Sequence, residues 1–447
     1  MIIPDSNSAS TGGYEIDNSL KLENDNAEQL YYTPSSAGNL KTWTYSCWFK
    51  RTELSYNMML FGANDTYVYF ETDDTLKLRF TGTYVFDTAR VFRDTSAWTH
   101  IVVAVDTTQA TEADRIKIYF NGEDQAGLFA NDSFPAQNTN TSWNNTLVHY
   151  VAGWATSSFN PSCYLAEVYN IDGQKLEATD FGEFDEDTGI WKPKAYTGSY
   201  GTNGYHLDFE NASDLGTVAA GTQHSFVKSN ITSVDQALDT PTNNFCTLNP
   251  LIVYGYPCTI SQGAVKAVDN SVGLGGAAGT VAVNKGKWYW EFQTNGGNTI
   301  IGIQDIEADT TAADNAHETA YTMGLYLLQE YNYVNDSGGG RNDGAVDGFV
   351  HANANFYGIA LNMDDNEIEY YVNGVQKGPT FSLDELSDLY LRPFVSSSSS
   401  ILYFNFGAIY PDPISTGNTD DNGYGNFEYA PPSGYYALCS KNLAEFG

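Results

Sequence analysis

Apolar and polar side chains alternate along several short stretches in the first half of the chain. The clearest stretch places every second side chain on one face: Trp43, Tyr45, Cys47 and Phe49. Because successive side chains of a strand point to opposite faces, this period of two predicts a half-buried β-strand. The same pattern predicts strands over 76–80, 98–105, 115–120 and 163–169. Asn121-Gly122 directly after one of them predicts a tight hairpin turn.

The second half of the chain shows the same two-residue period. One predicted strand carries Trp288, Trp290 and Phe292 on a single face. A hairpin is predicted over 357–374, where two alternating runs flank a turn at 363–366 and Asn373-Gly374 closes the second run. This hairpin is the clearest local prediction in the sequence.

The composition and the length extend this pattern to the whole chain. The 32 Tyr, 24 Phe and 41 Gly accompany a charged fraction of only 17%, which favours many short strands joined by turns. A chain of 447 residues exceeds the roughly 250–300 residues at which single cores stop growing. We therefore predict an all-β protein with two antiparallel β-sandwiches in tandem. The expected parts are an N-terminal arm (1–19), a first sandwich (20–194), an ordered connector (195–250), a second sandwich (251–411) and a Pro-rich C-terminal arm (412–447).

The charge of the chain bears on its partners. With 21 basic and 55 acidic side chains, the formal net charge is −34. Such a chain repels phosphate backbones and anionic membrane surfaces, so we expect neither nucleic acid nor a membrane as a partner. The acids are scattered through turns, as in a surface that serves solubility.

The cysteines and the N-terminal residues bear on where the protein is made. The five cysteines are an odd number without close pairs, so we expect neither a disulfide framework nor a zinc site: Cys47, Cys163, Cys246, Cys258 and Cys439. The first residues have no basic and apolar signal-peptide pattern, and no apolar run is long enough to span a bilayer. We expect synthesis in a reducing cytoplasm without a signal peptide.

Ordered motifs in the two halves resemble two known families. In the first, TWTYSCWFK, WTHIVVAVD, RIKIYFNG and CYLAEVYNIDG occur in the order seen in laminin-G-like, concanavalin A-type jelly-roll domains. In the second, GKWYWEF, YYVNG, LRPFVSSSSS and a final NFG resemble a SPRY domain. The Gly-Asp pair that many SPRY domains have is missing before Phe356-Tyr357. Both resemblances imply a binding protein whose rim loops hold carbohydrate or peptide.

Two further segments resemble structural proteins of bacteriophages. They are DTPTNNFCTLNP from Asp239 and APPSGYYALCSKNL from Ala430. The resemblance implies a virion protein, with other virion proteins of the capsid or tail as partners. Because virion positions are symmetric, a homo-oligomer is also expected.

The sequence offers little support for an enzyme. Retaining glucanases that share the jelly-roll fold carry their acids in an E-x-D-x-x-E strand. The nearest match, Glu183, Asp185 and Glu186, has the wrong spacing and lies in a turn beside Gly189. No nucleophile elbow, zinc-protease helix or phosphate-binding loop is present. We therefore predict a protein without catalytic residues or a required cofactor.

A polar region over 305–355 is the first candidate for ligand binding. Tyrosines and planar polar side chains together suit the faces and hydroxyls of sugars. The candidates are Tyr321, Tyr326, Tyr331, Asn332, Tyr333, Asn335, Asp336, Arg341, Asn342 and Asp343. In the alternative interpretation these tyrosines pack the loop and neighbouring subunits. A second set of candidates, in the first half, is Trp143, Asn144 and Trp154.

A calcium site is a further candidate in the C-terminal segment. Asn418, Asp420 and Asn422 are spaced like the start of a calcium loop, and Glu428 would supply the carboxylate that closes it. Glu428 falls one place early for that role, and a simple turn is the competing interpretation.

These observations combine into one functional expectation. We expect a bacteriophage protein of the virion surface, as a head decoration, head fibre or tail-fibre component, that adheres to a host-surface glycan or another exterior ligand. The alternatives are a capsid cement protein without a ligand and, third, a polysaccharide-degrading enzyme.

Overall fold

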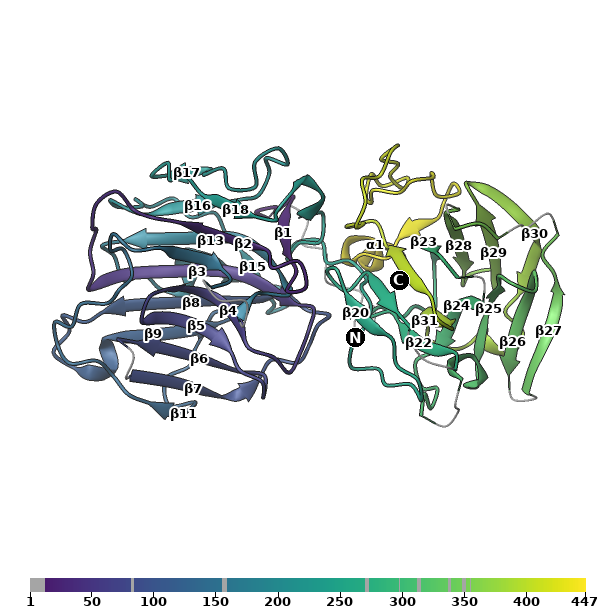
Figure 1. Ribbon diagram of the computed structural model, residues 1–447, viewed down its shortest axis with the longest axis horizontal. Coiled ribbons are helices and arrows are strands. Elements are labelled where there is room, and N and C mark those ends of the chain that lie inside the picture. Colours follow the sequence, from purple (N-terminus) through teal and green to yellow (C-terminus); the bar gives the residue numbers. More distant parts are fainter. Residues whose placement is uncertain are drawn as a thin grey trace. The chain divides into compact units, whose positions relative to one another are not determined.

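The computed structural model describes residues 13–81, 84–154, 159–269, 273–296, 298–311, 315–336, 339–347, 351–353 and 355–447. These residues form two compact units, which meet in the chain between Thr242 and Asn243. The first unit ends at Thr242 and the second runs from Asn243 to Gly447. Both units consist of mainly antiparallel sheets, which confirms the all-β class (Figure 1). Within the described residues the single α-helix is α1 (Ser440–Phe446), which is too short to cross a membrane.

One sheet of the first unit has nine strands in the described part of the chain. Its main path is β10-β9-β8-β3-β13-β1-β19, and β16 and β17 extend it from β13. The strands are β1 (Ser19–Leu22), β3 (Thr42–Arg51), β8 (Thr99–Asp106), β9 (Ile116–Phe120), β10 (Glu123–Asp124), β13 (Cys163–Asp172), β16 (Tyr205–Leu207), β17 (Ala220–Gly221) and β19 (Gln236–Ala237).

The other large sheet of the first unit has eight described strands in the order β11-β7-β6-β5-β4-β12-β2-β18. They are β2 (Gln29–Tyr32), β4 (Met58–Ala63), β5 (Thr66–Phe70), β6 (Thr75–Phe80), β7 (Tyr84–Val91), β11 (Phe129–Asp132), β12 (His149–Ala152) and β18 (Val227–Ser229). A separate hairpin is formed by β14 (Gly182–Phe184) and β15 (Trp191–Pro193).

The two large sheets enclose the core of the first unit. Tyr45 on β3 stacks on Phe61 of β4, in the other sheet, with 3.7 Å between ring centroids. The inward half of each alternating strand supplies this core, as the sequence pattern predicts. The hairpin turn predicted at Asn121-Gly122 is confirmed, since both residues have positive φ angles of 47° and 82°.

The segment expected as a connector, 195–250, is divided between the two units. Its strand β16 pairs with β13, β18 pairs with β2, and β19 pairs with β1. Residues up to Thr242 therefore complete the sheets of the first sandwich, and those from Asn243 belong to the second unit. Of the expected N-terminal arm, residues 1–12 lie outside the described residues, and Ser19 already begins β1.

One sheet of the second unit follows the order β20-β21-β32-β23-β28-β29-β30, with β33 beside β23. Its strands are β20 (Thr259–Ser261), β21 (Lys266–Val268), β23 (Lys287–Thr294), β28 (Tyr357–Asn362), β29 (Glu367–Val372), β30 (Val375–Ser382), β32 (Ile401–Asn405) and β33 (Tyr436–Ala437). The predicted hairpin is β28–β29, and the positive φ angles of Asn373 and Gly374 confirm the turn that leads on to β30.

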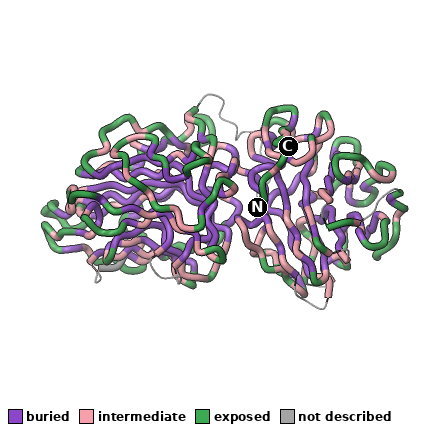
Figure 2. Tube along the Cα trace, turned by 45° about the horizontal axis from the view of Figure 1, so that its top comes forward, coloured by how far each residue is buried: buried purple, intermediate pink, exposed green. Residues whose placement is uncertain are grey.

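The other sheet has the order β22-β31-β24-β25-β26-β27. Its strands are β22 (Gly275–Ala278), β24 (Thr299–Asp305), β25 (Thr322–Tyr326), β26 (Tyr331–Asp336), β27 (Gly339–Ala345) and β31 (Leu391–Ser397). The hydroxyl of Tyr370 on β29 donates to Asn332 Oδ1 on β26 at 2.8 Å, so these two sheets also face each other. In both units, buried strands lie beneath more exposed connecting loops (Figure 2).

The C-terminal segment, expected as an arm over 412–447, is folded onto the second unit. Strand β33 pairs in parallel with β23, and Cys246 N donates to Leu438 O at 2.8 Å. The carboxylate of Glu291, on β23, accepts the backbone N–H groups of Glu428 and Tyr429. The proline-rich stretch thus leads into an ordered closing segment of this sandwich.

Candidate functional site

The outward face of the eight-stranded sheet carries an unusual number of aromatic side chains. In β5, Val68 and Phe70 point into the core, so Tyr67 and Tyr69 point to the opposite side. The same alternation turns Tyr31 of β2 and Tyr150 of β12 away from the core.

The register of the sheet brings side chains from distant parts of the sequence into one line. Across neighbouring strands, Arg79 pairs with Tyr67, Tyr67 with Gly62, Gly62 with Tyr150, and Tyr150 with Tyr31. Directly paired residues in adjacent strands point to the same face. The line therefore crosses β6, β5, β4, β12 and β2 at right angles to the strands.

Six neighbouring rings, which we call the aromatic row, follow this line from Tyr31 to Tyr67 and then continue beside it to Tyr69 on β5 and to Phe159. Neighbouring rings have centroids between 5.3 and 5.7 Å apart, in the order Tyr31, Tyr150, Trp154, Tyr67, Tyr69 and Phe159. All except Tyr69 are partly exposed. The row is thus an apolar strip edged by phenol hydroxyls, a combination that suits the face of a sugar ring.

Trp154 occupies the one position in the row where the sheet offers no side chain. Gly62 lies in the centre of the line, and a Cβ atom there would come within 3.0 Å of Trp154 Cζ3 and 2.5 Å of Tyr67 Cβ. Gln29 fixes the segment around Trp154, because its Nε2 donates to Trp154 O at 2.6 Å and to Asn160 Oδ1 at 2.8 Å. The absence of a side chain at Gly62 therefore leaves room for the indole of Trp154.

The row ends in a polar region on β6, β7 and β11. Arg79 Nε and Nη2 each lie 3.4 Å from the hydroxyl of Tyr69, and the guanidinium lies 6.0 Å from the centre of that ring. Within the described residues no carboxylate forms an ion pair with Arg79. Nε and Nη2 face Tyr69, whereas Nη1 has no hydrogen-bond partner among the described residues and can donate to a ligand.

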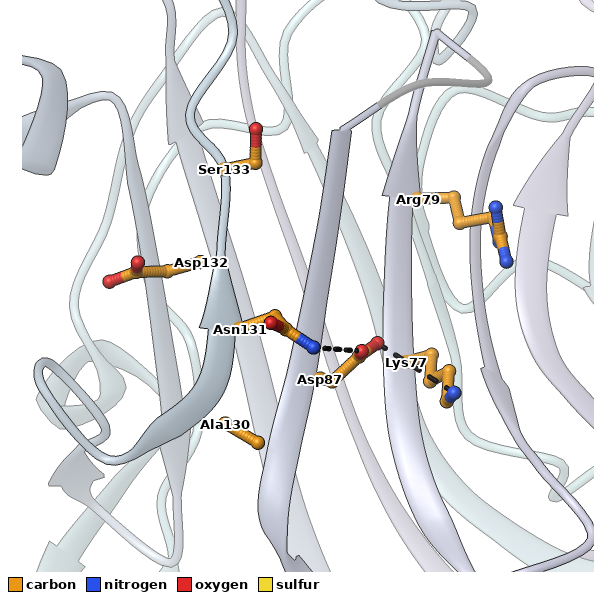
Figure 3. A pocket seen from close by; sticks show the side chains of 7 residues that line it. All are labelled: Lys77, Arg79, Asp87, Ala130, Asn131, Asp132 and Ser133. Carbon is orange, nitrogen blue, oxygen red and sulfur yellow. Dashed lines mark hydrogen bonds and ion pairs between the residues drawn. The ribbon is translucent and has the colours of Figure 1, made fainter.

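Beyond Arg79 the surface forms an open depression of about 510 Å³ (Figure 3). Asp87 lies in the middle, where Asn131 Nδ2 donates to Asp87 Oδ2 at 2.8 Å and Lys77 Nζ lies 4.0 Å from Asp87 Oδ1. Lys77 and Arg79 extend away from β11. The depression offers both hydrogen-bond donors and acceptors, as a site for hydroxyl groups requires.

The region predicted for ligand binding in the second unit is largely strand, where a loop was expected. Residues 322–345 form β25, β26 and β27, and β27 is the edge of its sheet. The glycines and polar residues that indicated a loop are tolerated at such an edge, where side chains face solvent. Tyr321, just before β25, has a positive φ of 57°.

The predicted tyrosines of this region form only a short surface. Tyr326 and Tyr331 are partly exposed and meet edge to face, with centroids 5.6 Å apart, and Tyr326 donates to Asn298 Oδ1 at 2.5 Å. Tyr333 is 8% exposed and packs against His317. Burial raises the pKa of Tyr333 to about 12, so its hydroxyl stays protonated at neutral pH.

The predicted polar side chains there are mostly engaged within the protein. Asn332 is fully buried and contacts Tyr370 and Asp343, while Asn335 Nδ2 donates to Glu318 O at 2.6 Å. Arg341 pairs with Asp336 and lies 3.8 Å from Asp343 and 3.7 Å from Asp384. Asn342 Oδ1 accepts Gly344 N and shapes the strand end. These contacts give the polar residues structural roles, while the side chain of Arg341 is 40% exposed and still reaches solvent.

In the first unit the structure separates Trp154 from the two residues predicted with it. Trp143 and Asn144 are both 0% exposed and lie in the core. Trp143 Nε1 donates to Asn170 Oδ1 at 2.9 Å, and Asn144 Nδ2 donates to Asp172 Oδ1 at 3.2 Å. Because both side chains are fully buried and hydrogen-bonded inside the core, neither can contact a ligand that approaches from solvent.

The four residues considered for calcium hold the C-terminal segment together. Asp420 accepts the N–H groups of Asn422 and Tyr424 on Oδ1, and Ala437 N and Asn442 Nδ2 on Oδ2. Asn418 Nδ2 donates to Glu428 O at 2.9 Å, and the Glu428 carboxylate accepts Ser415 N at 2.7 Å. In the described parts of the chain, no three or more His, Cys, Asp or Glu side chains gather as a metal site would need.

The acids that most resembled a glucanase motif lie in the β14–β15 turn. Asp185 Oδ1 accepts the backbone N–H groups of Thr188 and Asp187, and the hydrogen bonds from Thr188 and Lys192 lower the pKa of Asp185 to about 2. Lys192 pairs with both Asp185 and Glu183. These carboxylates therefore stabilise a surface hairpin.

Comparison with known proteins supports the first of the two resemblances. Residues 24–161 match a family described as the concanavalin A-like lectin/glucanases superfamily, which confirms the resemblance expected for the first half. This segment includes all six rings of the aromatic row, and it contains Arg79. None of the curated proteins compared with the chain matches it in sequence.

Solved structures with similarity to the chain include two SPRY domains and a pentraxin. The TRIM65 PSpry domain is 14% identical, with a TM-score of 0.29, covering 36% of this chain and 89% of its own. The human HERC1 SPRY domain is 20% identical, with a TM-score of 0.27 and coverages of 33% and 91%. The SAP-like pentraxin of Limulus polyphemus is 12% identical, with a TM-score of 0.28 and coverages of 37% and 80%.

Proposed function

We propose that this protein is a bacteriophage virion surface protein that adheres to a host-surface glycan through the aromatic row of its first unit. It acts as a head decoration, head fibre or tail-fibre component and binds its ligand without transforming it. Assembly into a homo-oligomer on the particle multiplies weak single-site binding, as linked sites do in general.

One observation carries the binding part of this proposal. The aromatic row is a series of rings on the sheet, all but Tyr69 partly exposed, and at one end lies the guanidinium of Arg79, which pairs with no carboxylate among the described residues. Large aromatic surfaces are costly to leave in contact with water, and monomeric proteins keep such contiguous patches mainly for binding. The matched family, which is named for lectins and glucanases, makes a carbohydrate the natural ligand class.

The virion part rests on the two segments that resemble phage structural proteins. In the structure, the segment from Ala430 forms β33 and α1, and Asp239 is buried against Lys50. Both segments are thus ordered parts of the fold. We therefore expect exposed residues next to them to form any interface with other virion proteins.

A glycan array with matched variants tests the adhesion. The wild-type chain is expected to bind at least one polysaccharide of a bacterial surface, and Trp154→Ala to weaken that binding by about tenfold or more, because one large ring contact is lost. Tyr331→Ala, which removes a partly exposed ring of the second unit, is the control and should bind as the wild type does. Equal loss in both variants would place the site elsewhere.

Localisation in the particle tests the alternatives. Gold-labelled antibodies against the first unit should label the outside of intact virions under the electron microscope. A protein that is covered by neighbouring capsid subunits and binds no glycan would be a cement protein. Release of reducing ends from a bound polysaccharide would show that the chain is an enzyme.

A further inference from the structure

We infer that the aromatic row binds an internal stretch of a linear, neutral polysaccharide that lies across the strands from β2 to β6. This inference rests on the proposed glycan binding and specifies its ligand class. The protein would then recognise the interior of a polysaccharide chain and not its terminal sugars.

The length of the row exceeds what a single sugar ring can cover. Together with Arg79, the line that the row follows crosses five neighbouring strands, from Tyr31 on β2 to Arg79 on β6. Strands lie about 4.8 Å apart, so the two ends are about 19 Å from each other along the sheet. Several consecutive sugar units are needed to fill that distance.

The surface continues at both ends of the row. Beyond Tyr31, the paired residue Val227 on β18 is 47% exposed. Beyond Arg79, the depression around Asp87 is open to solvent. A site for a chain end needs a wall that stops the polymer, whereas the described residues at these two ends provide an open path.

The row is also free of gaps, which favours a continuous polymer over separate small ligands. Gly62 has no side chain, so the strands alone would leave a gap in the line of rings at β4. Trp154, held from the side by Gln29, lies 5.3 Å from Tyr150 and 5.5 Å from Tyr67 and fills that position. Successive sugar rings can therefore stack along the entire line.

The charges favour a neutral polymer. The net charge of −34 repels a polyanion at long range. At the polar end, Lys77 is paired with Glu71 and lies 4.0 Å from Asp87, so two carboxylates already offset its charge and Arg79 is the remaining cation of the depression. Arg79 and Asn131 can donate to hydroxyl groups, and Asp87 can accept from them, without any need for a charge on the ligand.

The test measures binding to soluble polysaccharides by isothermal titration calorimetry with the full chain. The probes are amylose, dextran, mannan and hydroxyethylcellulose as neutral polymers, and alginate and polygalacturonate as uronic acid polymers. Oligosaccharides from the disaccharide to the hexasaccharide are then cut from the polymer that binds best. Affinity is expected to rise with length by about tenfold or more over this series and to change little with salt.

Two variants locate the polymer on the row. Tyr31→Ala, at the far end, should weaken binding of the hexasaccharide by about fivefold to tenfold but leave the disaccharide unchanged, whereas Trp154→Ala should weaken both. Tyr31→Phe keeps the ring and should bind as the wild type does. Circular dichroism of Tyr31→Ala shows whether any loss of binding in that variant comes from misfolding.

The outcomes separate this inference from the proposed function. Binding of no polysaccharide at all would remove both. Binding that a monosaccharide inhibits as well as the polymer does would keep the adhesion but overturn the chain-type site. A preference for alginate or polygalacturonate that disappears in high salt or in Arg79→Gln would overturn the neutral ligand.

Discussion

At the residue scale, buried ion pairs connect the segments of the first unit. Lys50 Nζ lies 2.7 Å from Asp239 Oδ2, and both side chains are 0% exposed. The other carboxylate oxygen of Asp239 accepts Trp98 Nε1 at 2.9 Å, and its backbone carbonyl accepts the Ser19 hydroxyl at 2.6 Å. One aspartate thus joins the first strand, the strand β3 and the last residues of the unit.

Removal of this carboxylate should strongly destabilise the first unit. Asp239→Ala removes the carboxylate that pairs with the buried Lys50 ammonium, and we expect the free energy of unfolding to fall by about 3–5 kcal/mol. Urea unfolding followed by tryptophan fluorescence measures the change. Lys117→Ala, which breaks the exposed pair with Asp124, is the control and should cost less than about 1 kcal/mol. A similar small cost in both variants would contradict the role given to the buried pair.

A buried histidine makes the first unit sensitive to acid. His100 stacks between Trp48 and Trp191, and Trp191 Nε1 donates to its Nδ1 at 3.1 Å. Nδ1 is therefore the unprotonated nitrogen, and Nε2–H donates to the Ser46 hydroxyl at 2.8 Å. Burial lowers the pKa of His100 to about 3, so the folded protein keeps this ring neutral.

The consequence is a loss of stability as the pH falls. In the unfolded chain a histidine takes up a proton below about pH 6.5, whereas His100 in the folded chain does so only near pH 3. The stabilisation is thus complete above pH 6.5 and declines between there and pH 3, with a slope of about 1.4 kcal/mol per pH unit. Urea titrations at several pH values should show a shallower slope for His100→Phe, which keeps the aromatic stack.

The difference between wild type and variant isolates this histidine from other titrating groups. Burial raises the pKa values of Glu28 and Glu291 to about 7, so these carboxyls favour the folded state as the pH falls from 7 towards 4.5. Their effect is present in both proteins and cancels in the comparison. Identical slopes for wild type and His100→Phe would contradict a neutral buried ring.

At the element scale, alternation predicted the strands that have one buried face. Trp43 to Phe49 and the hairpin around Asn373-Gly374 lie in strands as expected, because burial and turn chemistry favour the same structure there. The region of β26 and β27 was expected as a loop, since Asn, Asp and Gly dominate it. Pairing with β25 overrides those local preferences, and no single-sequence pattern records that pairing.

The aromatic row shows the same limit of sequence reasoning at a functional site. Trp154 could be proposed as a solitary tryptophan beside polar residues. Tyr31, Tyr150 and Tyr67 lie on β2, β12 and β5, but only the register of four neighbouring strands places them in one line. The alternating TYVYF of β5 was the available signal, because tyrosines on the non-core face of a strand remain accessible.

Two glycines in turns of the second unit allow a test of how tightly the C-terminal segment packs. Gly374 and Gly423 both have positive φ angles, of 75° and 82°. A Cβ on Gly374 would lie 2.7 Å from Tyr429 Cδ1, whereas a Cβ on Gly423 would meet nothing within 4 Å. Gly423→Ala therefore measures the backbone strain alone.

We expect Gly423→Ala to lower the free energy of unfolding by about 1 kcal/mol and Gly374→Ala to lower it by about 1–2 kcal/mol more. The additional cost arises because Tyr429 must move, and its N–H is hydrogen-bonded to the buried Glu291. Chemical denaturation of the two variants gives both values. Equal costs would mean that Tyr429 moves aside freely.

At the scale of the whole molecule, each unit is completed by chain that follows its main strands. In the first unit, residues 205–237 add strands to both large sheets. In the second, the segment 412–447 contributes β33, α1 and the loop centred on Asp420. Both sandwiches therefore depend on segments whose composition, rich in Gly, Asn and Pro, indicated connectors and arms.

Deletion of residues 412–447 should accordingly destabilise the second unit and leave the first unchanged. The deletion removes the N–H donors of Glu428 and Tyr429 from the Glu291 carboxylate, which is 0% exposed, and uncovers Cys246 where it pairs with Leu438. Loss of two hydrogen bonds to a buried carboxyl group costs roughly 2–3 kcal/mol. Differential scanning calorimetry of the full and the shortened chain measures the effect.

One transition should move to lower temperature, while the transition that Asp239→Ala shifts, which belongs to the first unit, should stay in place. If both transitions move together, the two units do not unfold separately. If neither moves, the segment is a docked appendage and Glu291 finds other partners.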